Sequence, residues 1–216
     1  MPVTGVPALQ ARFTDIKAIA TAADGSSLVI AQLFVPGVID TYKVFKITPE
    51  GVVVHVAGAN TAGFNFAEIP ATQSPIRPDG VNEGIAAARE CDGGFYFTES
   101  GNRFVRHVDK NGIIRLIAGN GGFGTPVEGP ANQTAITRFD ALTAGPDGSV
   151  YGAARGDCGT IYRIGPDGRI ARFAGTGHTA GLCNSFLAEN LPAKNAHIGL
   201  LSMAAAPDGA VYVTDY

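Results

Sequence analysis

The chain has 216 residues, of which 45% are hydrophobic and 16% are charged, and 29 are glycines. This composition is sufficient for a proper core, and its many glycines and few charges favour short strands and tight turns over long salt-bridged helices. The net charge of −3 and the lack of clustered Lys and Arg argue against nucleic-acid binding, and no apolar run is long enough for membrane insertion.

Four hairpins are the first predicted elements along the chain. Each consists of an apolar stretch, an Asp-Gly dipeptide and a second apolar stretch. Asp-Gly between apolar runs indicates a β-hairpin, because glycine reaches the positive φ angles that tight turns need. We name the two strands A and B. Their turns are Asp24-Gly25, Asp92-Gly93, Asp147-Gly148 and Asp208-Gly209.

A second hairpin, with strands C and D, follows three of the first. The segments are YKVFKITPEGVVVHVAG, RFVRHVDKNGIIRLIAG and TIYRIGPDGRIARFAG. Gly51, Gly112 and Gly168 end the C–D turns, and the apolar alternation in these segments is typical of strands. Each unit is therefore predicted to be a four-stranded antiparallel meander.

A short motif, P-A-x-(Q/N)-x-x-(I/F), lies between the units. Its prolines are Pro7, Pro70, Pro130 and Pro192, separated by 63, 60 and 62 residues, an interval that marks a repeat architecture. The favoured interpretation is structural. Proline suits the first turn of a short helix, and the Ile or Phe six residues later can fill the gap between units.

One meander of about 60 residues cannot bury both of its faces, so consecutive copies must pack face to face. We therefore predict an all-β protein, a β-propeller of four-stranded antiparallel meander blades, with about 3.5 blades in this chain. Residues 1–216 are expected to form a single partial propeller. Its predicted blades are 14–69, 83–130, 140–190, and strands A and B of a fourth at 200–216.

The run DKNGIIRLIAGNGGFGTPVEGPANQTAI resembles the long form of the NHL-repeat propeller blade found in teneurins and in bacterial YD-repeat (Rhs-like) proteins. The correspondence covers essentially the whole chain. This sequence departs from the pattern at Val127-Glu128-Gly129, where the family has Gly-Asp-Gly-Gly. The resemblance implies a propeller of a bacterial protein that is extracellular or at the cell surface. The chain shows no signal peptide, so a cytoplasmic location follows if Met1 is the natural start.

The predicted topology places the long D–A connections and the B–C connections on one face, which we call the long-loop face. The D–A connections cover about residues 59–81, 120–139 and 176–198. Long loops in a compact domain usually carry function, and aromatic residues on a rigid rim suit protein or glycan recognition. The candidate ligand-binding residues are Phe64, Phe66, Glu99, Asn102, Arg103, Phe123, His178 and Phe186.

Strand A of each blade lines the central channel of a propeller. Its residues here are small and apolar apart from Thr21, Thr143 and Ser202, with no His cluster and no carboxylate pair. We therefore predict no catalytic residues, no metal and no cofactor. The leading hypothesis is a noncatalytic recognition or scaffold module of a larger secreted or surface protein, which binds a protein or a glycan. Its rivals are a propeller-type lyase or hydrolase, similar to a lactonase or a streptogramin lyase, and RNA binding, which the acidic balance disfavours.

Two further expectations concern the cysteines and the end of the chain. Cys158 and Cys183 both fall on the long-loop face and Cys91 on the opposite one, so a Cys158–Cys183 disulfide is predicted in an oxidising compartment. The sequence stops inside the fourth blade, after its strand B. Either further repeats complete a six-bladed ring, or copies of the chain associate through their open blade edges.

Overall fold

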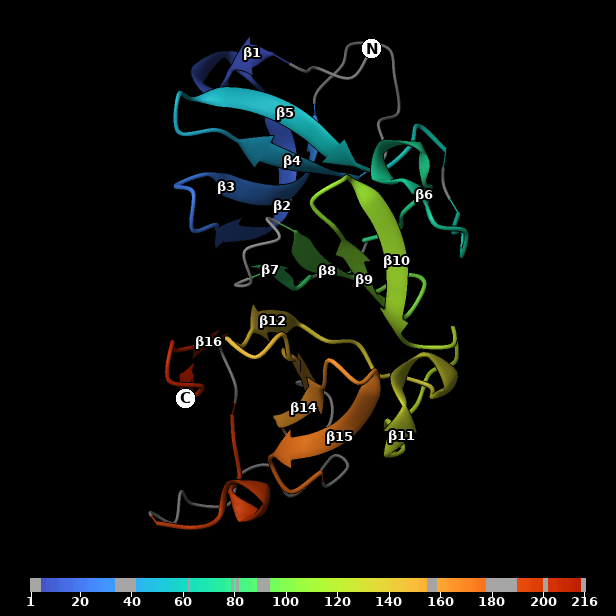
Figure 1. Ribbon diagram of the computed structural model, residues 1–216, viewed down its shortest axis with the longest axis vertical. Helices are drawn as coiled ribbons and strands as arrows, with labels where there is room; N and C mark the ends of the chain where they lie inside the picture. The colour runs from blue at the N-terminus through green and yellow to red at the C-terminus, as the bar shows by residue number, and fades with distance from the viewer. Residues whose placement is uncertain are drawn as a thin grey trace.

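A computed structural model of the chain describes residues 5–33, 42–61, 63–78, 80, 82–88, 94–154, 159–177, 190–199 and 202–214. These residues form three five-stranded antiparallel sheets and one two-stranded sheet (Figure 1). The helical elements among them are 3₁₀ turns of three residues each. None of these helices has the length or the apolar character to span a bilayer. The predicted all-β class is confirmed.

In each five-stranded sheet four consecutive strands form a meander, and the short strand that precedes them in the chain pairs with the last of the four. The first has the order β1 (Val6–Pro7), β5 (Val52–Ala57), β4 (Lys43–Ile47), β3 (Ser27–Leu33) and β2 (Phe13–Thr21). The second has the order β6 (Ile69–Pro70), β10 (Ile113–Ala118), β9 (Phe104–Val108), β8 (Phe95–Glu99) and β7 (Ile85–Ala87). The third has the order β11 (Gly129–Pro130), β15 (Arg169–Ala174), β14 (Thr160–Ile164), β13 (Val150–Ala154) and β12 (Ala141–Ala144). The two-stranded sheet pairs β16 (Ser202–Ala205) with β17 (Val211–Thr214).

The Asp-Gly turns close the A–B hairpins, as the sequence predicts. Gly25, Gly148 and Gly209 have φ angles of 81°, 79° and 89°, in the left-handed region that favours glycine. The aspartate before each glycine accepts a hydrogen bond from the backbone N–H two residues further on, at 2.9, 3.0 and 2.9 Å. This local bonding sets the hairpin register. Asp92-Gly93 lies outside the described residues.

The blades contain one strand more than the predicted four-stranded meander. β6 pairs with β10, the outermost strand of the sheet that follows it in the chain, with Ile69 opposite Ile114. β11 pairs with β15 in the same way. The motifs at Pro7, Pro70 and Pro130 therefore each supply the outer edge of the blade that follows, a long-range pairing that local sequence patterns do not reveal.

The alanine of the motif joins consecutive blades through its backbone. Ala71 N donates to Gly112 O at 2.7 Å, and Gly58 N donates to Ala71 O at 2.9 Å, so one residue connects the second sheet to the end of the first. Ala131 makes equivalent bonds to the next pair of blades. Both alanines are buried. The structural interpretation of the repeated motif is confirmed at these positions.

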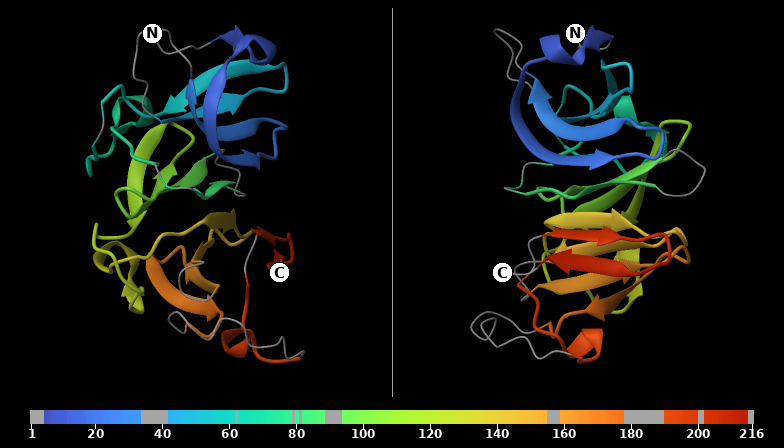
Figure 2. Two further views of the ribbon diagram at one scale, coloured as in Figure 1. Left: turned by 180° about the vertical axis from the view of Figure 1, so that it is seen from behind. Right: turned by 90° about the vertical axis from the view of Figure 1, so that its left-hand side faces the viewer.

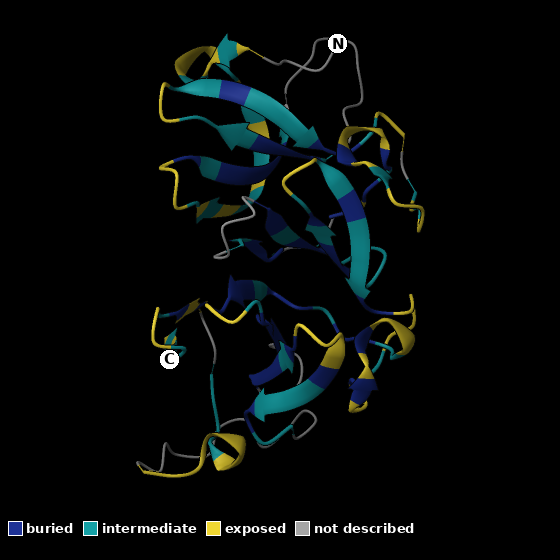
Figure 3. Ribbon diagram, in the orientation of Figure 1, coloured by how far each residue is buried: buried dark blue, intermediate teal, exposed yellow. Residues whose placement is uncertain are grey.

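Three of the four hydrophobic clusters join residues of consecutive sheets, and the fourth lies on the first sheet. Figure 3 shows where the buried residues lie along the strands. Ile30 of the first sheet and Phe97 of the second belong to one buried cluster. Val105 of the second sheet and Ile164 of the third belong to the next cluster. Contacts also join β2 to β7, β7 to β12 and β12 to β16, and Figure 2 shows the β16–β17 hairpin beside β12. The innermost strands thus follow one another along the inner side of the stack.

Replacing Ile136 with alanine is expected to lower the free energy of unfolding by about 2–5 kcal/mol. Ile136 lies six residues after Pro130 and is only 2% exposed within the cluster between the second and third sheets, so truncation leaves a cavity. Ile19→Ala is the matched control, because that side chain is 61% exposed. Urea unfolding measures both changes, and equal losses would contradict the role assigned to Ile136.

Candidate functional site

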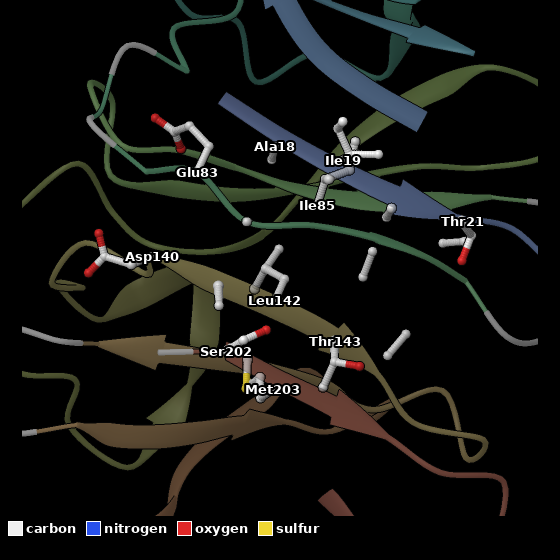
Figure 4. A pocket seen from close by; sticks show the side chains of 16 residues that line it. Ala18, Ile19, Thr21, Glu83, Ile85, Asp140, Leu142, Thr143, Ser202 and Met203 are labelled. Carbon is white, nitrogen blue, oxygen red and sulfur yellow. The ribbon is translucent and has the colours of Figure 1, made fainter. Parts of the chain in front are cut away.

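The innermost strands border a cavity of about 500 Å³ (Figure 4). Its walls are mostly small or apolar, and include Ala18, Ile85 and Met203. Hydroxyl groups are contributed by Thr21, Thr143 and Ser202. This part of the lining agrees with the residues expected for strand A.

Two carboxylates lie at one end of the cavity, just before the strand A residues considered in the sequence analysis. Glu83 comes two residues before β7, and Asp140 comes directly before β12. Figure 4 shows both at the same end of their strands. The packing there is tight, because a Cβ on Gly84 would lie 2.6 Å from Leu142 Cγ. Glu83 is bonded to Ser100 of the B–C connection, so this end belongs to the long-loop face.

Glu83 is 4% exposed and accepts several hydrogen bonds. Its Oε1 accepts from Gly80 N at 2.8 Å, and its Oε2 accepts from Ser100 Oγ at 2.9 Å and from the Thr98 hydroxyl. Ser100 N lies 3.3 Å from both oxygens. A Cβ at Gly80 would be 2.8 Å from Glu83 Oε1, so glycine leaves room for the carboxyl group.

Burial raises the pKa of Glu83 to about 7, against the opposing effect of these hydrogen bonds, which favour the ionised form. At neutral pH the protonated and ionised forms are therefore both well populated. A carboxyl group in this condition can accept a proton and return it within one reaction cycle. Glu83 is the residue in the cavity best suited to acid-base chemistry.

A second cavity of about 390 Å³ adjoins the Glu83 site, and we call it the groove. Ser100 and Gly80, which bond to Glu83, also line the groove, as does Asp140. Arg138 Nε donates to Asp140 Oδ1 at 2.9 Å. Arg103 closes the groove near Phe123, with its guanidinium carbon 4.6 Å from the centre of the ring.

The structure thus places two predicted site residues, Arg103 and Phe123, beside the cavity that contains Glu83. Neither acid is predicted as a site residue from the sequence, because both precede the small and apolar residues of strand A. The available signal was an acidic residue immediately before strand A in two consecutive units. This pattern does not identify a site by itself, because the two acids reach one cavity only when the inner strands stack.

Phe64 and Phe66 form an exposed aromatic pair in the first D–A connection. They are 55% and 53% exposed, and their ring centres lie 5.2 Å apart. Both also contact Phe104, which is buried at the start of β9. The pair has the exposure that a recognition surface needs, and its binding role stays a prediction.

Glu99 and Asn102 lie beneath this aromatic pair. Glu99 has no exposed surface, and its Oε1 lies 3.4 Å from Nη1 of the fully buried Arg106. Asn102 Nδ2 donates to Glu99 Oε2 at 2.6 Å and to Gly63 O at 3.0 Å, and Arg106 Nη2 donates to Asn65 O at 2.9 Å. These bonds fix the segment that carries the two phenylalanines.

The remaining predicted residues cannot be placed. His178, Phe186 and both cysteines of the predicted disulfide, Cys158 and Cys183, lie outside the described residues. Their roles stay predictions.

No protein-family model matches this sequence, and no curated protein is significantly similar to it. Solved structures do match. A protein of unknown function from Bacteroides thetaiotaomicron has a TM-score of 0.62 at 14% identity, over 93% of this chain and 44% of that one. Regucalcin, a calcium-binding protein from Agrobacterium tumefaciens, has a TM-score of 0.52 at 13% identity, over 92% and 52%. A gluconolactonase from Xanthomonas campestris has a TM-score of 0.51 at 12% identity, over 95% and 56%.

These similarities establish the fold and nothing finer, because the identities are low. The chain is an all-β protein built of β-propeller blades. It spans about half the length of the solved structures that it matches. The assignment to the NHL-repeat type, the blade boundaries and the extracellular location stay predictions.

Proposed function

We propose that this propeller hydrolyses a cyclic ester at the long-loop end of its channel, with Glu83 transferring the proton. The observation that carries the proposal is a buried carboxyl group with a pKa of about 7 at the end of a 500 Å³ cavity. The size of the cavity suits a small organic substrate. The similarity to a gluconolactonase agrees with a lactone as that substrate. The proposal takes up the hydrolase alternative in place of the noncatalytic module.

In the proposed reaction, ionised Glu83 removes a proton from a water molecule as its oxygen attacks the lactone carbonyl carbon. The tetrahedral intermediate then collapses, the ring C–O bond breaks, and Glu83 returns its proton to the departing alkoxide oxygen. The product is a hydroxy acid, and Glu83 is again ionised. Arg138, held by Asp140, brings positive charge close to the negative oxygen of the intermediate.

Regucalcin is described as a calcium-binding protein, which raises the question of whether the cavity of this chain could hold a metal ion. Calcium takes six to eight oxygen ligands. The described residues contain no group of three or more His, Cys, Asp or Glu side chains that could hold a metal ion. In addition, donors of the chain already bond to both oxygens of Glu83, and Arg138 bonds to Asp140. The described residues do not fit a metal centre.

The pH dependence of hydrolysis tests the proposal. If ionised Glu83 is the base, kcat/KM is expected to rise about tenfold per pH unit below pH 7 and to level off above it, because the pKa of Glu83 is about 7. Initial rates on glucono-1,5-lactone, corrected for spontaneous hydrolysis, give the profile. A profile that is flat from about pH 5 to pH 8, or a lack of turnover of neutral and of carboxylated lactones alike, would refute the proposed function.

Recognition of a protein or a glycan is the second candidate, and the exposed Phe64–Phe66 pair favours it. Hydrogen bonds from Asn102 and Arg106 hold the backbone that carries the two rings, so the rings lose little conformational entropy on binding. Recognition and hydrolysis use different parts of the long-loop face, so one chain can carry both. Self-association through open blade edges and membership of a larger secreted protein remain proposals from the sequence.

A further inference from the structure

The groove beside Glu83 carries more positive charge than the composition of the chain suggests. Arg103 and Arg138 line it together with one acid, Asp140, whereas the whole chain has a formal net charge of −3. Arg138 is bonded to Asp140. Arg103 has no carboxylate partner among the residues that the structure describes, and its guanidinium lies over the ring of Phe123.

The backbone at Arg103 is held in an unusual conformation. Arg103 has a φ angle of 59°, and Asn190 is the other non-glycine residue with positive φ in the described part of the chain. Glycine would adopt this conformation with less strain. Gly119 packs against the same corner so closely that a Cβ there would lie 2.1 Å from Arg103 O. A strained corner that bears a long cationic side chain points to a binding role for that side chain.

The groove and the channel cavity meet at Asp140, and Glu83 of the channel cavity is bonded to Gly80 and Ser100 of the groove. Ser100 gives its N–H and its hydroxyl to the Glu83 carboxyl group and also lines the groove, and Asp140 lines both cavities. A molecule that occupies both would place one end near the proton-transfer group and the other near Arg103. Guanidinium groups bind carboxylates through paired, charge-assisted hydrogen bonds.

We propose that the substrate is an anionic lactone, a sugar-acid lactone that carries a free carboxylate, and that Arg103 binds this carboxylate in the groove while the ester lies at Glu83. The inference rests on the proposed hydrolase function and adds the substrate class. Phe123 lies against one face of the Arg103 guanidinium, so the N–H groups at the edge of the guanidinium can bind the ligand. Arg138 adds attraction for the same charge.

The test compares two substrates that share a six-membered ring, glucono-1,5-lactone, which is neutral, and glucaro-1,5-lactone, which carries a carboxylate. Arg103→Gly is the principal variant, because glycine tolerates the local φ angle and the fold is not put at risk. We expect Arg103→Gly to raise KM for the glucarolactone about 10–100-fold, and at least tenfold more than for the gluconolactone, with kcat little changed. Arg103→Lys is expected to recover part of the loss.

Arg115→Ala is the matched control, since Arg115 lies on β10 and pairs with Glu68 and Asp109 away from the groove. Equal effects of Arg103→Gly on both substrates would overturn the inference and leave the hydrolase function standing. Calorimetric titration with glucarate, and with the uncharged sugar alcohol sorbitol as its control, separates the two failures. Arg103-dependent binding of glucarate without turnover of any lactone would keep the anion site and refute the hydrolase.

Discussion

Replacing Glu83 with glutamine is expected to lower kcat for lactone hydrolysis about 10²–10⁴-fold, the range found when a general acid-base group is removed. Glutamine has nearly the same shape but cannot accept a proton from water in the relevant pH range. The dependence of the residual rate on pH below 7 should disappear together with the activity. Initial rates of the two proteins from about pH 5 to pH 8 measure both effects.

The glutamine variant should fold, because its amide can satisfy the same neighbours. The amide oxygen can accept from Gly80 N, and the NH₂ group can donate to the hydroxyl oxygens of Ser100 and Thr98. The Thr98 hydroxyl can then donate to Gly84 O, which lies 3.5 Å away. Loss of activity is therefore expected without loss of structure.

Stability measurements give this prediction its control. The folded protein holds the Glu83 proton up to about pH 7, whereas the unfolded chain releases it near the usual pKa of 4.5. The folded state therefore binds more protons between these values, so this group lowers the free energy of unfolding as pH rises from about 4.5 to 7. Glu83→Gln should remove that dependence and be at least as stable as the parent at pH 8. An inactive variant that is also unfolded would not support a catalytic role, and an active one would refute it.

Replacing Arg106 with methionine is expected to lower the free energy of unfolding by about 3–5 kcal/mol, because a buried carboxylate would lose its charged partner. The side chains of Arg106 and Glu99 are both fully buried, and Arg106 Nη1 lies 3.4 Å from Glu99 Oε1. Burial raises the pKa of Glu99, and the charge of Arg106 opposes the rise. Burial likewise lowers the pKa of Arg106.

The double variant Glu99→Gln, Arg106→Met tests the cause. It should recover much of the lost stability, since no unpaired charge remains, and double-mutant analysis of urea unfolding measures the coupling. Without Arg106 the pKa of Glu99 should rise further, so the single variant should lose more stability at pH 8 than at pH 5. Additive losses with no difference between the two pH values would show that the pair matters only for packing.

Much of the fold could be predicted because the relevant information is local. Asp147 and Gly148 set a turn with bonds that span two residues, and the same signal recurs at each described A–B hairpin. Alternating apolar residues then identify the strands on both sides. The spacing of Pro70 and Pro130 reveals the unit, and a unit too small to bury itself must stack on its neighbours.

The candidate site was predicted only in part, because its chemistry depends on contacts between distant segments. Arg103 and Phe123, which the sequence analysis assigns to the long-loop face, line one groove in the structure, and their binding role stays a prediction. Glu99 was placed in the same rim, yet the structure buries it against Arg106 and Asn102. Glu83 was passed over because nothing in its neighbouring sequence indicates a carboxyl group with a raised pKa.

The sequence by itself determined the hairpins, the repeat and the face that carries the long loops, since turns and strand alternation depend on neighbouring residues. The tertiary structure decided which strand each proline motif completes, which of the polar rim residues are buried, and that Glu83 and Asp140 share one cavity. The physical reason is desolvation. The pKa of Glu83 depends on what surrounds it, and so does the absence of a carboxylate partner for Arg103 among the described residues; these surroundings come from segments brought together only when the blades stack.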